Sequence, residues 1–215
     1  MLTLDTTLTF FAASVMLALV PGPDNVFVLL HSATHGWRSG FLVVLGLCTG
    51  LLFHTAAVAL GLAALMASSS IAFTALTLLG ALYLLWLAWQ SWHAPVHSSH
   101  ATSSLDNPVP DSILSTRQTY SRGVLMNITN PKVAIFFLAF LPQFVVANQG
   151  AVGLQILLLG GIFMVATLFT FGAIAFFAGR FGQVFQSSTF AQRSLNRLAS
   201  LIFCALAMRL LVTNL

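Results

Sequence analysis

Charge is almost missing from this sequence: charged side chains make up 6% of its 215 residues, and glutamate does not occur at all. A typical soluble domain is about 25% charged, so this chain cannot cover a surface that faces water. The formal net charge of +4 is small, and the basic residues are scattered among hydrophobic runs. That distribution is typical of a protein in a lipid bilayer and not of a nucleic-acid-binding protein, whose basic residues form a patch.

The shortage of acidic residues and cysteines also limits the chemistry that the chain can perform. A zinc protease of the His-Glu-x-x-His type requires glutamate, and an aspartic protease requires two intramembrane aspartates where only Asp24 falls within an apolar run. Cys48 and Cys204 lie in apolar segments, where free cysteines are usually buried, and two cysteines make neither a disulfide framework nor a metal site. We therefore expect no enzyme, no resident cofactor and no metal centre.

Long hydrophobic runs fill most of the chain. A membrane-spanning helix needs about 20 mostly apolar residues, and six such runs are present: 7–30, 39–65, 70–92, 122–147, 151–179 and 194–213. A signal peptide begins with a positive region, and no lysine or arginine precedes Arg38, so the first run is predicted to be a retained span. Backbone groups in lipid have to be satisfied within each segment. The sequence therefore predicts an all-α polytopic membrane protein with six transmembrane helices.

A polar stretch, 93–121, separates a first three-helix repeat, 1–92, from a second one, 122–215. Its three prolines and its many serines and threonines favour a polar cytoplasmic linker. Three of its side chains are histidines, His93, His97 and His100. A metal site would need further ligands, and no cysteine or acidic residue stands at a matching spacing. The favoured interpretation is a polar loop that happens to contain histidines.

The basic residues near the spans predict the orientation in the membrane, because lysine and arginine are enriched in cytoplasmic loops. The connections after spans one, three and five carry Arg38, Arg117, Arg122, Arg180 and Arg193. The N-terminus and the connections after spans two and four carry none. We therefore expect these three connections in the cytoplasm and both termini outside the cytoplasmic (inner) membrane of a bacterium. Arg209, near the far end of span six, argues in the opposite direction.

The second half of the chain resembles the first. Gly36 and Gly46 recur as Gly150 and Gly160, and both offsets are 114 (150−36 and 160−46). In each half a proline-interrupted span comes first, followed by a glycine-rich span and a third span. An odd number of spans per half gives the two copies opposite orientations, so the pattern predicts two inverted three-helix repeats, an arrangement found in many secondary transporters.

Span one is interrupted by Pro21, Gly22 and Pro23, which are followed at once by Asp24 and Asn25. Each proline lacks a backbone donor and clashes with the preceding turn, whereas Pro23 suits the first turn of a new half-helix. Such a half-helix presents free N–H groups and a positive dipole end inside the membrane. The alternative is a simple proline kink that packs against its neighbours, although a kink does not need a carboxylate.

Span four has a matching interruption at Asn130, Pro131 and Lys132. A central Asp or Lys costs about 2.5–3.5 kcal/mol on insertion scales, so Asp24 and Lys132 are expected to face a shared polar interior, where they could form a pair. The difference in their depth lies within the reach of a lysine stem. A purely structural ion pair is the alternative to a functional site, and intramembrane ionisable residues are functional candidates by default.

Span two places Gly46, Gly50 and His54 near one helical face, at positions i, i+4 and i+8. The two glycines allow a close helix contact. His54 is then either a polar residue bonded across that contact or a titratable group on a transport path. Near the end of span four, Pro142 should bend the helix, and Gln143 could satisfy a freed carbonyl.

These motifs together resemble the lysine-exporter/threonine-efflux (LysE/RhtB) family of amino-acid exporters over nearly the whole chain, apart from the linker. They are Pro21-Gly22-Pro23, Asn130-Pro131-Lys132 followed by Phe136-Phe137 and Leu141-Pro142-Gln143-Phe144, the glycine series from Gly36 to Gly61, and Gly80-Ala81-Leu82-Tyr83-Leu84. The resemblance implies six spans in two inverted repeats, export of amino acids or related metabolites by proton antiport, and a homodimer. Family members vary after the Pro-Gly-Pro, so the resemblance allows Asp24 to tune the substrate class.

The sequence thus predicts a secondary transporter that exports a small zwitterionic molecule, an amino acid or a derivative. The half-helix starts after Pro23 and Pro131 would receive the substrate carboxylate. Asp24 would receive the ammonium group or a coupling proton, and Lys132 would hold the Asp24 charge or replace the substrate charge in an empty site. The alternative is a divalent metal-ion exporter. A dehydrated cation needs several carboxylate, His or Cys ligands, and the spans offer few of them.

Overall fold

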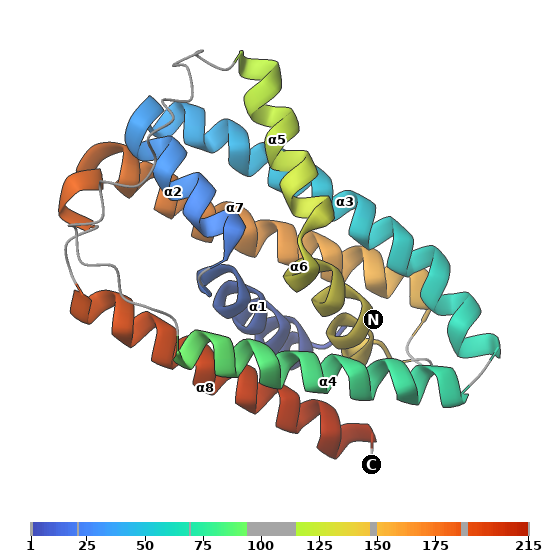
Figure 1. The fold of residues 1–215 in the computed structure, drawn as a ribbon. Helices are drawn as coiled ribbons and strands as arrows, with labels where there is room; N and C mark the ends of the chain where they lie inside the picture. Colours follow the sequence, from blue (N-terminus) through green and yellow to red (C-terminus); the bar gives the residue numbers. More distant parts are fainter. Residues whose placement is uncertain are drawn as a thin grey trace.

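Helices make up all the secondary structure in the described part of the chain. The structure, a computed structural model, describes residues 2–20, 22–68, 70–93, 115–146, 150–185 and 189–214. The helices are α1 (Leu4–Leu19), α2 (Pro23–His35), α3 (Trp37–Ser68), α4 (Ser70–Trp92), α5 (Thr116–Thr129), α6 (Pro131–Ile135), the π-helical turn η1 (Phe136–Phe140), the 3-10 turn η2 (Leu141–Phe144), α7 (Val152–Phe185) and α8 (Thr189–Asn214) (Figure 1). The all-α prediction is confirmed for these residues.

Two of these helices are long and apolar enough to cross a membrane as single elements. The stretch Trp37–Gly61 of α3 has 25 residues and Val152–Arg180 of α7 has 29. Two bent pairs, α1 with α2 and α5 with α6 to η2, raise the number of candidate spans to four if each pair crosses once. Helices α4 and α8 have 23 and 26 residues, and the apolar stretch of α8 runs over Asn196–Met208.

Helix α4 has the bounds of the predicted third span, whereas other helices extend beyond the predicted runs: α2 ends at His35, α7 at Phe185, and α8 begins at Thr189. Helix α5 begins at Thr116, inside the predicted stretch 93–121. A reciprocal cap starts it, because the Ser115 hydroxyl accepts from the Gln118 N–H and the Gln118 side chain accepts from the Ser115 N–H. The first turns of α5 are polar, so hydrophobicity alone does not reveal them. Residues 94–114, with His97 and His100, lie outside the described residues.

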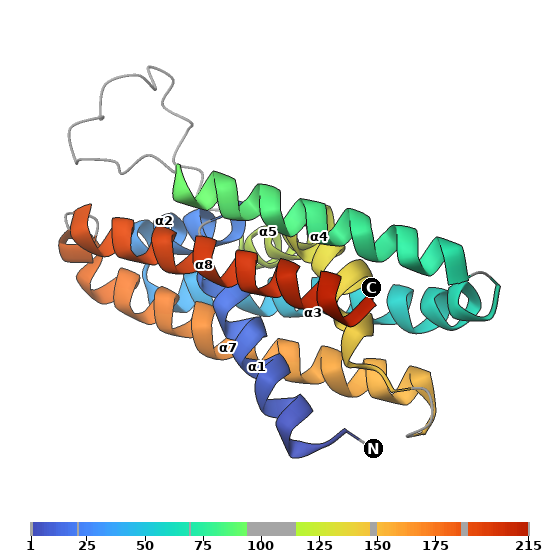
Figure 2. The same cartoon turned by 90° about the horizontal axis from the view of Figure 1, so that it is seen from below.

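The ends of the helices fall into two groups (Figures 1 and 2). The N- and C-termini lie at one end of the bundle, together with the end of α3 and the start of α7. The start of α3, the end of α4, the start of α5 and the end of α7 lie at the opposite end. Helix α3 packs against α5 and α7, and α4 runs beside α8.

Arginines gather at the end of the bundle opposite the termini, which we call the basic end. They sit in the first turns of α3, in α5, near the end of α7 and in the first half of α8: Arg38, Arg117, Arg122, Arg180, Arg193 and Arg197. Three of them lie over aromatic rings, at 5.5 Å for Arg38 and Trp37, 5.4 Å for Arg180 and Phe176, and 5.8 Å for Arg197 and Trp92. Arginines beside tryptophans are typical of a membrane–water interface.

Glycines allow α3 to lie directly against α5. A methyl group added at Gly46 would overlap the Tyr120 carbonyl, and one added at Gly123 would overlap the Val43 carbonyl. Backbone atoms cannot move aside as a flexible side chain can, so the contact requires both glycines. In the second half, a methyl group at Gly160 would overlap Thr55 of α3. One glycine pair of the predicted repeat, Gly46 and Gly160, therefore lies on packed faces of α3 and α7, whereas nothing lies against Gly36 and Gly150 in the described part of the chain.

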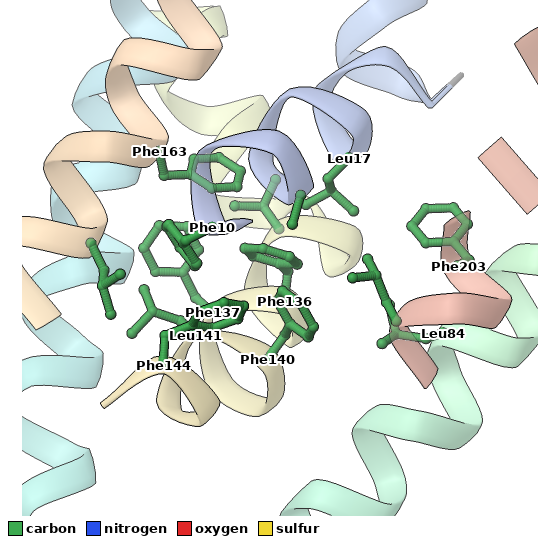
Figure 3. Close-up of a cluster of buried hydrophobic side chains, with 14 of the residues drawn as sticks. Phe10, Leu17, Leu84, Phe136, Phe137, Phe140, Leu141, Phe144, Phe163 and Phe203 are labelled. Carbon is green, nitrogen blue, oxygen red and sulfur yellow. The ribbon is translucent and has the colours of Figure 1, made fainter. Parts of the chain in front are cut away.

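An aromatic cluster fills the interior beside η1 and η2 (Figure 3). The Phe10 ring of α1 lies 6.0 Å from the Phe136 ring and 5.0 Å from the Phe144 ring, and the Phe163 ring of α7 lies 5.3 Å from that of Phe136. These rings are fully or almost fully buried, so they form packed core. Gln143 Nε2 donates to the carbonyl of Ala139 in η1, at 3.5 Å.

Candidate functional site

The first helix break separates α1 from α2, whose axes differ by 65°. Helix α2 begins with Pro23 at the position where a missing N–H does no harm. Gly22, its N-cap, leaves room for another chain segment: a Cβ at this position would lie 3.2 Å from Lys132 Nζ. Pro21 lies outside the described residues. The structure therefore has two half-helices here, as the sequence predicts.

The second helix break separates α5 from the helical segment that starts at Pro131, and the bend is 50°. Asn130 is the N-cap of α6, because its Oδ1 accepts a hydrogen bond of 3.0 Å from the Lys132 N–H. The start of α6 thus already has an acceptor. The start of α2 has no side-chain cap. The two half-helix starts, which the sequence treats alike, therefore differ in how far they remain open to a substrate carboxylate.

The Lys132 side chain joins the two breaks. Its Nζ donates to the Leu17 carbonyl at 3.2 Å and to the Val20 carbonyl at 3.1 Å, at the C-terminal end of α1. The last carbonyls of a helix lack partners within the helix and carry a partial negative charge. Asn25 Nδ2 donates to the Ala18 carbonyl at 2.7 Å. Lys132 and Asn25 thus supply hydrogen-bond donors to the carbonyls at the end of α1, inside the bundle.

Asp24 shares this interior, although the ammonium group is not bonded to it. The exposed fractions of Asp24 and Lys132 are 3% and 6%, and Asp24 lies within electrostatic range of Lys132, Asn130 and His54. The prediction of a shared polar interior is confirmed. A direct ion pair, which the sequence leaves open, is not formed: among the described residues, the partners of Lys132 Nζ are carbonyl oxygens. The Lys132 ammonium group binds the C-terminal end of α1, and from this position its positive charge attracts the Asp24 carboxylate.

Unpartnered polar atoms surround the two breaks. Among the described residues, four buried side-chain atoms have no hydrogen-bond partner: Asp24 Oδ1, Asn25 Oδ1, Asn127 Oδ1 and Asn130 Nδ2. All four belong to residues within or next to the breaks. Each unpaired buried polar atom costs about 1–3 kcal/mol, and buried polar atoms are almost always paired. Four unpaired atoms in one region therefore indicate a binding site for a polar ligand.

His54 lies on the α3 face that packs against α5. A Cβ at Gly50 would overlap the Asn127 side chain, and one turn later His54 Nε2 lies 3.1 Å from the Asn127 carbonyl. The half-buried imidazole therefore bonds across the helix contact, and it is also within electrostatic range of Asp24. Both interpretations from the sequence, a structural bond and a transport path, agree with this position.

Replacing His54 by leucine should destabilise the protein by about 1 kcal/mol, because the Asn127 carbonyl loses its donor. Glutamine at position 54 should restore most of that stability through its side-chain N–H. Thermal unfolding in detergent and export from proteoliposomes would be measured for both variants. Full export by a folded His54→Gln protein would exclude His54 from proton transfer, whereas lost export at normal stability would support it.

Asn127 was not predicted as a site residue, although the sequence places a second asparagine close before Asn130. Asn127 stands one turn before Asn130 in an apolar segment, and both side chains are buried at the break. Other sequence candidates do not join the site. His93 Nδ1 bonds to the Trp89 carbonyl at the end of α4, and the half-buried Cys48 and Cys204 are free thiols. The described residues contain no group of three or more His, Cys, Asp or Glu side chains that could hold a metal.

Comparisons with known proteins identify a family and several similar proteins. The model of the LysE type translocator family matches residues 15–214. The homoserine/homoserine lactone efflux proteins of Salmonella typhi and Salmonella typhimurium (strain LT2) are 31% identical to the chain over 159 residues, which cover 74% of this chain and 73% of each relative. An uncharacterized membrane protein of Bacillus subtilis (strain 168), YrhP, is 27% identical over 159 residues, 72% of this chain and 74% of its own. No solved structure matches the chain.

Proposed function

We propose that this protein, which belongs to the family of LysE type translocators, exports amino acids or closely related small zwitterionic metabolites from the cytoplasm. Family membership makes it a membrane translocator of small molecules and not an enzyme. The observation that carries the proposal is the pair of helix breaks, where buried Asp24 and Lys132 stand among four unpartnered polar atoms. A zwitterion brings one charge of each sign to such a site and leaves its net charge unchanged.

Homoserine and its lactone are the first substrates to test, because two relatives are named as their efflux proteins. In this proposal the substrate ammonium group binds at Asp24, beside the acceptor Asn25 Oδ1. The start of α2 after Pro23, which has no side-chain cap, can receive a carboxylate. Lys132 supplies the positive charge that balances Asp24 in the empty site.

We also propose that export is driven by proton antiport through Asp24, with His54 as a second candidate. A carboxylate that alternately binds an ammonium group and a proton couples the two movements, because either one neutralises it. The buried position of Asp24 supports this role, since an unneutralised carboxylate is costly in low dielectric.

For the architecture we propose six spans in two inverted repeats, with the basic end in the cytoplasm. The element order supports a repeat: each half consists of a broken span, a long helix that follows a positive-φ glycine (Gly36 at 84°, Gly150 at 122°), and a third helix. The homodimer implied by the family resemblance remains an expectation.

Both termini should therefore lie on the periplasmic side of the inner membrane. An alkaline phosphatase fused after the last residue should be active, because this enzyme matures only outside the cytoplasm. The same reporter inserted between residues 98 and 104 should be inactive. The reverse pattern would show that the basic end faces outward and would contradict the proposed orientation, although not the repeat.

The proposed function is tested by counterflow in proteoliposomes loaded with an unlabelled amino acid. Labelled homoserine, homoserine lactone and a panel of amino acids would be offered outside, with and without a pH gradient. Saturable uptake of at least one amino acid or lactone is expected, and an imposed pH gradient should change its net flux. Uptake of divalent metal ions in place of every amino acid tested would overturn the proposal in favour of the metal-exporter alternative.

A further inference from the structure

Asn130 has two polar groups, and the structure uses one of them. Its Oδ1 caps α6 by accepting from the Lys132 N–H, whereas its buried Nδ2 has no partner. This assignment of oxygen and nitrogen follows from the cap, because the opposite orientation would place an NH₂ group against an N–H. Because the cap uses Oδ1, the Asn130 side chain presents its Nδ2 donor inside the bundle. The exposed fraction of Asn130 is 2%.

The donor of Asn130 lies beside the groups that give the break its charge. Asn130 is within interaction range of the Asp24 carboxylate, yet Nδ2 and Asp24 Oδ1 are both without a hydrogen bond. The next residue but one, Lys132, extends to Gly22 and the end of α1. The same small region therefore holds acceptors on α2, at Asp24 and Asn25, and the Asn130 donor at the start of α6.

We propose that Asn130 recognises the carbonyl end of the substrate, by donating from Nδ2 to its carboxylate or lactone carbonyl while Oδ1 holds the start of α6. The inference rests on the proposed function, and it fixes how the substrate lies: the ammonium group is at Asp24, and the carbonyl group is held between the uncapped start of α2 and the Asn130 donor at the start of α6. The first N–H of α6 is already bound by Asn130 Oδ1, so in this inference the donor to the substrate at the start of α6 is the Asn130 side chain and not the helix backbone. The substrate class is then a primary amine with a neighbouring carboxylate or ester carbonyl.

The test compares a substrate with the amine that remains when its carboxylate is removed, homoserine with 3-amino-1-propanol. Aspartate caps a helix as well as asparagine does, so Asn130→Asp keeps the cap, removes the donor and adds a like charge opposite the substrate carboxylate. A hydrogen bond to a charged group contributes about 1.5–3 kcal/mol, so KM for homoserine should rise about 10- to 100-fold. KM for the amine should change less than threefold.

A second variant guards against misfolding of the first. Asn130→Gly adds no charge, and glycine is a tolerated N-cap; it should also raise KM for homoserine and leave that for the amine unchanged. Asn196→Asp makes the same exchange at a buried asparagine on α8 and should leave both values unchanged. Equal KM values for homoserine in the parent and a folded Asn130→Gly protein would overturn the inference. The proposed function itself would fail only if the parent transported no amino acid or lactone.

Discussion

Lys132→Met should destabilise the protein more than Asp24→Asn, and either change should abolish export. Methionine leaves the Leu17 and Val20 carbonyls without a donor and Asp24 without a nearby cation, and breaking a buried charge pair costs about 3–5 kcal/mol. In Asp24→Asn the ammonium group keeps both carbonyl partners, so the expected loss is about 1–3 kcal/mol. Thermal unfolding in detergent and proteoliposome export would be measured for each protein.

The double variant makes this prediction sharper. Asp24→Asn combined with Lys132→Met should be more stable than Lys132→Met alone, because no unpaired carboxylate remains. It should be less stable than Asp24→Asn alone, since the end of α1 still lacks its donor. Export should not return. Strictly additive losses would show that the two charges do not interact, and export by the double variant would remove both residues from the mechanism.

A valine at Gly46 should prevent α3 and α5 from packing and should leave little folded protein. Its Cβ would overlap the Tyr120 carbonyl and approach the Val124 nitrogen to 2.9 Å, and both are backbone atoms. Overpacking typically destabilises a protein by about 1–3 kcal/mol, and occasionally by more. Because the neighbour of Gly46 is rigid backbone, the destabilisation by Gly46→Val should be at the top of this range. Because the same face carries His54 and contacts Asn127, export should fail even in the fraction that folds.

Gly61 provides the matched control in the same helix. Among the described residues, nothing beyond its own helix backbone lies within 4 Å of a Cβ at this position, and valine replaces glycine in a helix at no cost in propensity. Size-exclusion profiles and unfolding temperatures should therefore match the parent for Gly61→Val and differ for Gly46→Val. Equal behaviour of the two variants would contradict the close contact between α3 and α5.

Much of the fold could be predicted because the membrane imposes a simple length rule. Span three was placed at 70–92, the bounds of α4, and the prolines located both breaks, because a ring without an N–H cannot continue a helix. The start of α5 at Thr116 could not be predicted in this way. Its first turns are polar and are held by a local cap, so they carry no apolar signal.

The partners of Lys132 could not be predicted from the sequence for a different reason. A buried ammonium group can be satisfied by a carboxylate or by several carbonyl oxygens, and the sequence shows only the carboxylate as a charged letter. The free carbonyls exist because α1 ends at Leu19 and α2 begins only at Pro23, so the last carbonyls of α1 have no partner within a helix. Asn127 was overlooked similarly, since its importance depends on the neighbouring glycine face of α3.

The bond from Lys132 to α1 has a consequence for biosynthesis. Leu17 and Val20 leave the ribosome more than a hundred residues before Lys132, since the two bonds span 115 and 112 positions. Uncovered carbonyls are not tolerated in hydrocarbon, whereas the Ala18 carbonyl receives its local donor, Asn25, almost at once. The newly made first half therefore has to keep its break in contact with water or the insertion machinery. We expect this first half to reach its final position in the bilayer only after the fourth span, which carries Lys132, has been synthesised.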